Sequence, residues 1–406
     1  MRGNDVIIKE YNKQTELELG LKVRNSIFPE INVDAWERGE PQTAVIAFSG
    51  DEAIGFIPLS LRKFKLAPGV IITAAFENAV GVKKEFRGES IGTMMLSEAA
   101  CFLKSRVDVL LVYRDDERSK GYKFYKHTGH TGLNYMRCFT CDVLTGNLDR
   151  NVLITAGVEE LENDCDQFMQ IFEESYCAYG GFPVRTHDYW CRNIKKRAHG
   201  AIPVDFLSFK LMEGNSVTSY IIAGEVQKPK EEDGVRKLEI FEMAAKGCDE
   251  MRMKVLLEAV CSFAGREGFS KIEIMTNDQS PFVCILNCLN FKPGLRLMQM
   301  MALNFDAEAL FKKLWSKKIE IPGVEIRLRT PERDMLLSKH MGETLKTVIL
   351  EMKDETFLNW IMGRVDFKSR VREGSITLVN GNERIVELLS NAIPLSNWVY
   401  HDIDYI

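Results

Sequence analysis

The stretch Val80-Gly81-Val82-Lys83-Lys84-Glu85-Phe86-Arg87-Gly88-Glu89-Ser90-Ile91-Gly92-Thr93 decides the fold that we expect for this chain. It follows an apolar run at 70–82 that is typical of a strand or a pair of strands. It leads into residues 91–103, whose apolar side chains recur at helical spacing. The pattern predicts a strand, a tight basic turn and an amphipathic helix in immediate succession.

This order of elements predicts a site for a diphosphate. A tight turn points several backbone N–H groups into one spot, and the N-terminus of the following helix adds the positive end of its dipole. Arg87 adds a positive charge, while Gly88 and Gly92 allow a ligand to approach the backbone closely. A turn with a purely structural role is the alternative, since short motifs also match by chance.

Strands and helices of moderate length surround this segment between residues 5 and 148. We expect strands at 43–48, 53–59, 107–113 and 134–144, and helices at 91–103 and 120–127. The fold class is therefore α+β, with mixed sheets and a strand–loop–helix unit at the centre of this half.

The same order recurs further along the chain, which indicates a duplicated fold. We expect helices at 164–176 and 251–264, and strands at 216–225, 235–244, 271–275 and 298–304. The last hundred or so residues differ: Asp306 and Asn382 are placed to cap helices, and strands are expected at 324–328, 347–352 and 375–379. This predicts a third, smaller α/β domain.

The second repeat lacks the equipment of the first. Its equivalent stretch, 241–250, has one glycine and the acids Glu242, Asp249 and Glu250, which would repel a diphosphate. We expect it to bind none.

Size and composition set further bounds. With 406 residues, 45% hydrophobic and 27% charged, the chain fits two to four globular domains. A net charge of −5 argues against a nucleic-acid partner and suits a cationic substrate such as a polyamine, a lysine side chain or an aminoglycoside. The N-terminal segment has no signal-peptide pattern and no apolar run is long enough to span a bilayer, so a cytoplasmic protein is expected.

The cysteines and histidines give no expected metal site. Cys138 and Cys141 have CxxC spacing, but on a strand their side chains face opposite ways, and buried free thiols are the expected state. His127 and His130 sit near Tyr125 and could touch an acceptor. The other histidines show no metal-ligand spacing: His187, His199, His340 and His401.

The segment Arg87-x-x-Ser90-x-Gly92 resembles the acetyl-CoA motif of the GNAT acyltransferase superfamily, with serine in place of the first glycine. The resemblance implies acetyl-CoA as cosubstrate. It also implies the residues that would bind it: Val80, Gly81, Val82, Phe86, Arg87, Gly88, Glu89, Ser90, Ile91, Gly92 and Thr93.

Downstream, Phe124-Tyr125 and Gly129 match a second GNAT segment, in which His130 replaces the usual phenylalanine. The resemblance implies that Tyr125 faces the sulfur of CoA and serves the leaving thiolate. A buried aromatic residue with a satisfied hydroxyl is the alternative.

Three further segments are similar to those of one branch of this superfamily: Tyr179-Gly180-Gly181-Phe182-Pro183-Val184-Arg185 followed by Tyr189-Trp190, the stretch Leu238–Ala245, and the acidic and aromatic end at Trp398–Ile406. Through them the chain resembles, over nearly its whole length, the enhanced-intracellular-survival (Eis-like) acetyltransferases. This implies an acetyl-CoA-binding GNAT domain at 1–148, a degenerate GNAT-like domain at 149–304 and a sterol-carrier-protein-like domain at 305–406. It also implies a homo-oligomer, since this family tends to form hexamers. In that family the C-terminal carboxylate, here that of Ile406, accepts a proton from the amine in direct attack on the thioester. The last nine residues are apolar enough to dock rather than fray, and docking without catalysis stays open, with Glu77 as another candidate base.

The implied activity is acetyl transfer to a primary amine. The runner-up is a non-catalytic CoA- or lipid-binding protein derived from the same fold, and transfer of a longer acyl chain is a third reading.

Overall fold

The computed structural model describes most of the chain. The described residues are 6–27, 43–77, 80–114, 117–143, 151–195, 198–199, 202–226, 235–319, 321–338 and 346–404. Within them, no helix is both long enough and apolar enough to cross a lipid bilayer.

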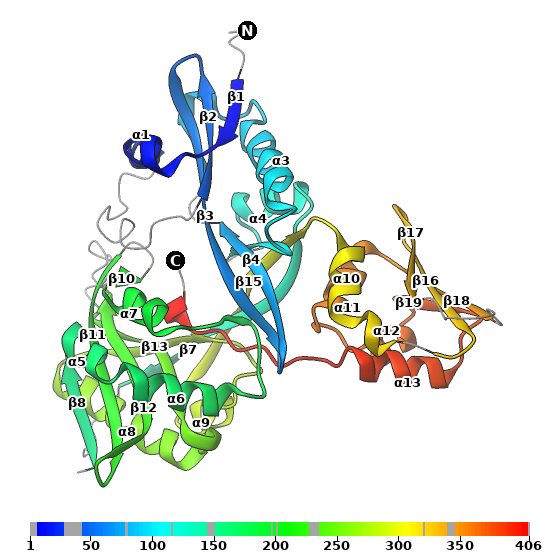
Figure 1. Cartoon of the computed structure of the whole chain (residues 1–406). Coiled ribbons are helices and arrows are strands. Elements are labelled where there is room, and N and C mark those ends of the chain that lie inside the picture. The colour runs from blue at the N-terminus through cyan, green and yellow to red at the C-terminus, as the bar shows by residue number, and fades with distance from the viewer. Residues whose placement is uncertain are drawn as a thin grey trace.

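One large mixed sheet joins the first three quarters of the chain (Figure 1). Its central path runs β1-β2-β3-β4-β6-β15-β7-β14-β13-β12-β11-β10, with β5 and β9 beside β3 and β8 beside β11. The strands are β1 Val6–Glu10, β2 Thr43–Ser49, β3 Glu52–Ala67, β4 Val70–Glu77, β5 Gly81–Val82, β6 Val109–Tyr113, β7 Thr131–Asp142, β8 Val152–Ala156, β9 Phe182–Pro183, β10 Ala198–His199, β11 Ile202–Glu213, β12 Ser216–Val226, β13 Lys237–Ala245, β14 Lys271–Thr276 and β15 Lys292–Asn304.

The two repeats exchange their last strands. β15, from the second repeat, pairs antiparallel with β6 of the first. β7, from the first repeat, lies between β15 and β14. Each repeat therefore completes the sheet of the other, and a continuous sheet rather than a linker joins the ranges expected to be two domains. The domain boundaries themselves stay a prediction.

Helices cover this sheet: α1 Lys13–Ile27, α3 Ile91–Leu103, α4 Lys120–His127, α5 Val158–Asn163, α6 Cys165–Tyr176, α7 His187–Lys195, α8 Glu250–Arg266 and α9 Val283–Cys288. The expected helices at 91–103 and 120–127 have the observed bounds, because their apolar stripes are the buried faces. Ile91, Met95, Leu96, Ala99 and Leu103 of α3 are all buried, for example. Both repeats thus show the expected α+β order.

The C-terminal part forms a separate small sheet covered by helices (Figure 1). Its order is β17-β16-β18-β19. The elements are α10 Ala307–Trp315, β16 Val324–Arg329, β17 Asp334–Ser338, β18 Lys346–Met352, α11 Asp354–Ile361, α12 Phe367–Arg372, β19 Ile376–Val379 and α13 Glu383–Ala392. The two expected helix caps are confirmed: Asp306 accepts from the Ala309 N–H and Asn382 from the Ile385 N–H. Its likeness to sterol carrier protein stays a prediction.

Candidate active site

The loop between β5 and α3 is held by its own hydrogen bonds. The Lys83 N–H donates to the Ile54 carbonyl of β3 at 2.8 Å. The Arg87 Nε donates to the Val82 carbonyl at 2.8 Å, which fixes the base of an exposed guanidinium on the loop. Gly88 has φ +89, a backbone conformation that other residues adopt only with strain. The expected tight basic turn is therefore present at the expected residues.

Helix α3 begins without a side-chain cap. Ser90 is its N-cap, with φ 59 and ψ 14, and makes no side-chain cap hydrogen bond. The first N–H groups of a helix have no carbonyl partner within the helix, so those of Ile91, Gly92 and Thr93 are directed at whatever lies before α3. Together with the dipole, they make this helix start an acceptor of anions.

The strands before the loop diverge. β4 and β6 run parallel, and their pairing ends at Glu77 and Val112. The chain continues into β5, which pairs on its other side with β3, Val82 opposite Gly55. Among the described strands, β5 pairs with no other. One edge of the backbone at Gly81–Val82 is therefore open to pairing by a ligand.

Helix α4 packs directly on the first turn of α3. A Cβ added at Gly92 would lie 3.3 Å from the ring of Phe124, so glycine permits this approach. The next residue, Tyr125, is buried, and its ring meets the His130 ring edge-on at 4.9 Å between centroids. Tyr125, the expected acid, therefore lies on a helix that packs against the start of α3, directly after the loop that we expect to bind the cofactor.

A buried acid–base pair lies beside Tyr125. His130 Nε2 is 3.1 Å from Glu77 Oε1, and both side chains are fully buried. His130 Nδ1 is 3.1 Å from the Thr128 hydroxyl. Glu77 is the last residue of β4, where β4 leaves β6. Sequence reasoning singles out both residues separately. Nothing in the sequence signals their pairing, because 53 positions separate them.

The C-terminal segment crosses from the small sheet to the large one (Figure 1). Trp398 is fully buried, and its indole N–H donates to the Leu66 carbonyl of β3 at 2.8 Å. The backbone of Gly180 exchanges hydrogen bonds of 2.9 Å with Asn397 and Val399. The expected docking of the tail is confirmed as far as Asp404. Tyr405 and Ile406, and with them the carboxylate that we expected to act as base, lie outside the described residues.

The end of this tail reaches the first repeat. Tyr400 lies 6.0 Å, centroid to centroid, from Tyr113, the last residue of β6, and Tyr113 stacks on Phe76 of β4 at 5.6 Å. Burial and the nearby charge of Asp404 raise the pKa of Tyr113. The described part of the tail therefore lies beside the carboxyl ends of β4 and β6, the strand end from which the chain leads into the loop at 80–93.

Three buried charges anchor the tail. Arg185 lies 2.9 Å from Asp404 and 2.6 Å from Glu242, and all three side chains are at most 4% exposed. Burial alone would lower the pKa of Arg185, but the two carboxylates raise it above its ordinary value. Asp404 also accepts from the Tyr189 hydroxyl at 3.1 Å, which in turn accepts from Arg62 of β3 at 2.9 Å. The network thus joins both repeats through the tail.

In the second repeat, side chains bond to the backbone of the corresponding strand end and helix start. The Ser175 hydroxyl bonds to both the N–H and the carbonyl of Ala245, at the end of β13. The Tyr176 hydroxyl donates to the Met243 carbonyl at 2.5 Å. Asp249 caps α8 by accepting from two of its first N–H groups. Of the acids noted in this stretch, Glu242 pairs with Arg185 in the buried ion network and Asp249 caps the helix start. That this repeat binds no diphosphate stays a prediction.

The histidines need one correction. We expected His187 to have no metal-ligand spacing, yet it lies one helical turn before Cys191 on α7. The structure brings both to Cys165 of α6, with the three ligand atoms within 4.8 Å of one another. The His-x-x-x-Cys spacing was visible in the sequence, but the third partner lies 22 positions upstream on another helix.

Comparison with known proteins agrees with this geometry. Residues 9–130 match the sequence model of the acetyltransferase (GNAT) family. Over these residues the chain is similar to the GNAT family. Comparison with curated protein sequences gives no match.

Solved structures extend the likeness over the rest of the chain. A GCN5-related N-acetyltransferase from Anabaena variabilis aligns with a TM-score of 0.68 at 9% identity, over 97% of this chain and 98% of that one. A probable N-acyltransferase from Enterococcus faecalis aligns with 0.67 at 14%, over 99% and 100%. Eis1 from Mycobacterium abscessus aligns with 0.64 at 12%, over 98% and 99%. At these identities the likeness establishes the fold, and that fold is the expected tandem GNAT arrangement with the C-terminal unit included.

Proposed function

We propose that this protein is an N-acetyltransferase that moves an acetyl group from acetyl-CoA to a primary amine by direct attack on the thioester. The observation that carries the proposal is the contrast between two helix starts. α3 begins behind a basic turn with no side-chain cap, whereas Asp249 caps its counterpart α8. In the first repeat, the N–H groups at the helix start can bind a diphosphate. In the second repeat, Asp249 already accepts hydrogen bonds from those N–H groups.

The loop supports a cosubstrate with a long polar arm. The N–H groups of residues 88–93 face the diphosphate in this proposal, and Arg87 adds charge at the same point. The open edge of Val80–Val82 pairs with the amides of the pantetheine arm, as an added strand would. With the pantetheine arm paired in this way, the thioester would lie beside β5 and point toward Glu77, the last residue of β4.

Tyr125 serves the leaving sulfur in this proposal. A thiol has a pKa of ~8.5 and a tyrosine ~10, so full transfer of the proton to the thiolate is uphill by about 2 kcal/mol. Tyr125 therefore acts first as a hydrogen-bond donor to the charge that develops on sulfur. In a site closed to water, stabilising such developing charge commonly lowers the reaction barrier more than any other single effect.

The attacking amine needs a proton acceptor, and there are two candidates. One is the carboxylate of Ile406, two residues beyond Asp404, where the described part of the docked tail ends. The Glu77–His130 pair lies at the end of β4, beside Tyr125. We place the Ile406 carboxylate first, since the resemblance to Eis-like enzymes implies it, and Glu77 second.

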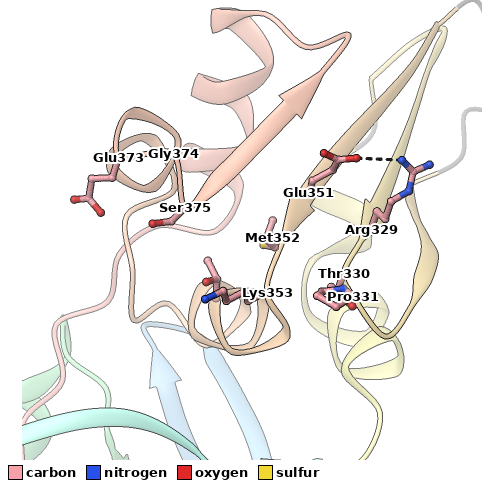
Figure 2. A pocket seen from close by; sticks show the side chains of 10 residues that line it. Arg329, Thr330, Pro331, Glu351, Met352, Lys353, Glu373, Gly374 and Ser375 are labelled. Carbon is pink, nitrogen blue, oxygen red and sulfur yellow. Dashed lines mark hydrogen bonds and ion pairs between the residues drawn. The ribbon is translucent and has the colours of Figure 1, made fainter.

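A lipid-carrying function is less well supported. The pocket of the C-terminal unit has a volume of about 660 Å³ and lies between β16, β18 and the start of β19 (Figure 2). Charged side chains line much of it, among them Arg329, Glu351, Lys353 and Glu373, and Arg329 pairs with Glu351 at 3.0 Å. Pockets for acyl chains are lined mainly by apolar side chains, so this one suits a polar ligand better.

The proposal is tested by thiol release from acetyl-CoA with a panel of polyamines, aminoglycosides and lysine peptides. We expect amine-dependent release and one CoA bound per chain by calorimetry. Binding without turnover for every amine class would favour the CoA-binding alternative. Two CoA molecules per chain would refute the closed second repeat. A cytoplasmic location and assembly into a hexamer stay proposals that the resemblance alone supports.

A further inference from the structure

Two helices of the second repeat bring three soft ligands together. Cys165 is the first residue of α6, and His187 and Cys191 lie four positions apart on α7. Residues with this spacing share one face of a helix. Cys165 and Cys191 are buried, while His187 is 57% exposed. The three side chains therefore lie where the contact between α6 and α7 reaches the protein surface.

Two of the three distances between the ligand atoms match those around one tetrahedral metal ion. Zinc binds thiolate sulfur at about 2.3 Å and imidazole nitrogen at about 2.0–2.1 Å, so ligand atoms on one ion lie ~3.5–3.8 Å apart. Cys191 Sγ lies 3.7 Å from Cys165 Sγ and 3.7 Å from His187 Nδ1. The three ligand atoms all lie within 4.8 Å of one another, and His187 Nε2 is 3.8 Å from Cys191 Sγ, so the imidazole ring has to turn to aim one nitrogen at the ion.

A carboxylate lies near the histidine. His187 Nε2 is 3.9 Å from Asp166 Oδ1, which is longer than a hydrogen bond, and the Asp166 side chain is 90% exposed, so it must move closer to accept from the ring. A histidine that binds metal through one nitrogen commonly donates the other N–H to a carboxylate, which fixes the ring. A surface hollow of about 600 Å³, lined by His187, Cys191 and Arg192 among others, gives ions and water access.

We propose that Cys165, His187 and Cys191 form a Zn²⁺ site, with water from the hollow as fourth ligand. Two thiolates and an imidazole suit zinc and are poor ligands for magnesium or calcium. Each thiol releases its proton to solvent when the ion binds.

A zinc ion at this site would link α6 to α7, next to the contact that holds the C-terminal tail. Tyr189, on α7 between the two ligands, donates to Asp404 of the docked tail. Zinc would therefore stabilise the helix that holds the tail, independently of whether the protein transfers acetyl groups.

The test uses the full-length chain, stripped with a chelator, kept reduced with a phosphine and then loaded with Zn²⁺ or Co²⁺ alone. We expect about one zinc per chain by elemental analysis. Cobalt should give the thiolate charge-transfer band and the strong visible bands of tetrahedral coordination. Zinc should raise Tm, because it binds the folded state.

Variants locate the ion. Cys191→Ser and His187→Ala should each lose affinity at least tenfold, since even outer partners of a metal ligand are worth about 10–100-fold. His187 is exposed, so its variant keeps the fold. Cys284→Ser with Cys288→Ser is the matched control, because these exposed cysteines have the same spacing on α9. It should keep the zinc and the rise in Tm.

Two results would overturn the site. One is reduced wild-type protein that binds no stoichiometric zinc, including the case in which the unreduced protein holds a Cys165–Cys191 disulfide instead. The other is a loss of zinc in the control as large as in Cys191→Ser.

Discussion

The guanidinium of Arg185 donates to the carboxylate of Asp404 at 2.9 Å, across 219 positions of the sequence. This contact fixes the tail two residues before its end. Arg185 also pairs with Glu242, so one buried cation balances two buried anions. Burial raises the pKa of Glu242 while Arg185 opposes that rise. The stability of the network therefore depends more on the arginine than on either acid.

Arg185→Met should destabilise the protein far more than Asp404→Asn. The first leaves two buried carboxylates without their cation, which costs about 3–5 kcal/mol. The second leaves Arg185 paired with Glu242 and should cost about 1–3 kcal/mol. Urea unfolding of both variants measures the difference. Equal losses would mean that the three charges do not act as one network.

Arg87→Glu should weaken CoA binding severely, because it places a negative charge beside the diphosphate and removes the bond to the Val82 carbonyl. Lys104→Glu is the matched control. It makes the same change of charge at the exposed far end of α3, ~20 Å away. Calorimetry with CoA should separate the two. Unchanged affinity in Arg87→Glu would remove the loop from the proposed site.

Ser90→Gly should stabilise the protein. Ser90 holds φ 59, a left-handed conformation that costs a residue with a Cβ roughly 1–2 kcal/mol. Glycine gives back about 0.4–1 kcal/mol through the entropy of the unfolded chain, so we expect a net gain of ~0.5–1 kcal/mol. Asn290→Gly is the control: Asn290 has φ 62, but asparagine tolerates this conformation and little gain is expected. A loss of stability in Ser90→Gly would show that the serine hydroxyl has a structural partner.

The local elements could be read from the sequence because their signals are local. The amphipathic stripe of α3 and the caps at Asp306 and Asn382 act within one helical turn, and each was predicted where it stands. The strand–turn–helix at 80–93 was likewise found from neighbouring residues alone.

The features that were missed depend on contacts between distant segments. The exchange of β7 and β15 depends on pairing between strands that are far apart in the sequence, and no local pattern encodes it. The same is true of the Glu77–His130 pair and of Cys165 meeting α7. The length of β3 was also missed. β3 runs on to Ala67, well past its predicted end at Leu59, and this added part includes the half-buried Arg62 and the exposed Lys63, which interrupt the apolar run that marked the strand.

Acidification below neutral pH should destabilise the protein through His401. Burial and then the charge of Arg185 lower its pKa well below the ordinary value. The unfolded chain takes up this proton near pH 6.5 and the folded one does not, so stability is fully present above that pH and falls below it. The slope is at most ~1.4 kcal/mol per pH unit.

His401→Phe should flatten this dependence, because a ring of similar size then sits uncharged among Phe172, Tyr176 and Phe182. His127→Gln changes an exposed histidine and should leave the slope unchanged. Urea unfolding across the acid range compares all three proteins. A wild-type slope equal to that of His401→Phe would contradict the assignment.

Tyr125 and the Ile406 carboxylate should act on opposite sides of the thioester, and two changes separate their roles. Tyr125→Phe removes one hydroxyl from a buried ring and should lower kcat by ~10²–10⁴ if the group is a true acid, with little change in CoA affinity.

Deleting Tyr405 and Ile406 moves the carboxylate back by about 7 Å, at ~3.3–3.6 Å per residue, which breaks any hydrogen bond to the amine. The anchors at Trp398 and Asp404 stay in place, so the shortened chain should still fold and bind CoA. If it also acetylates at the parental rate, the tail only supports the fold. Glu77→Gln would then be the variant that lowers kcat, because the Glu77 carboxylate contacts His130, whose ring meets that of Tyr125, and it lies where β4 parts from β6.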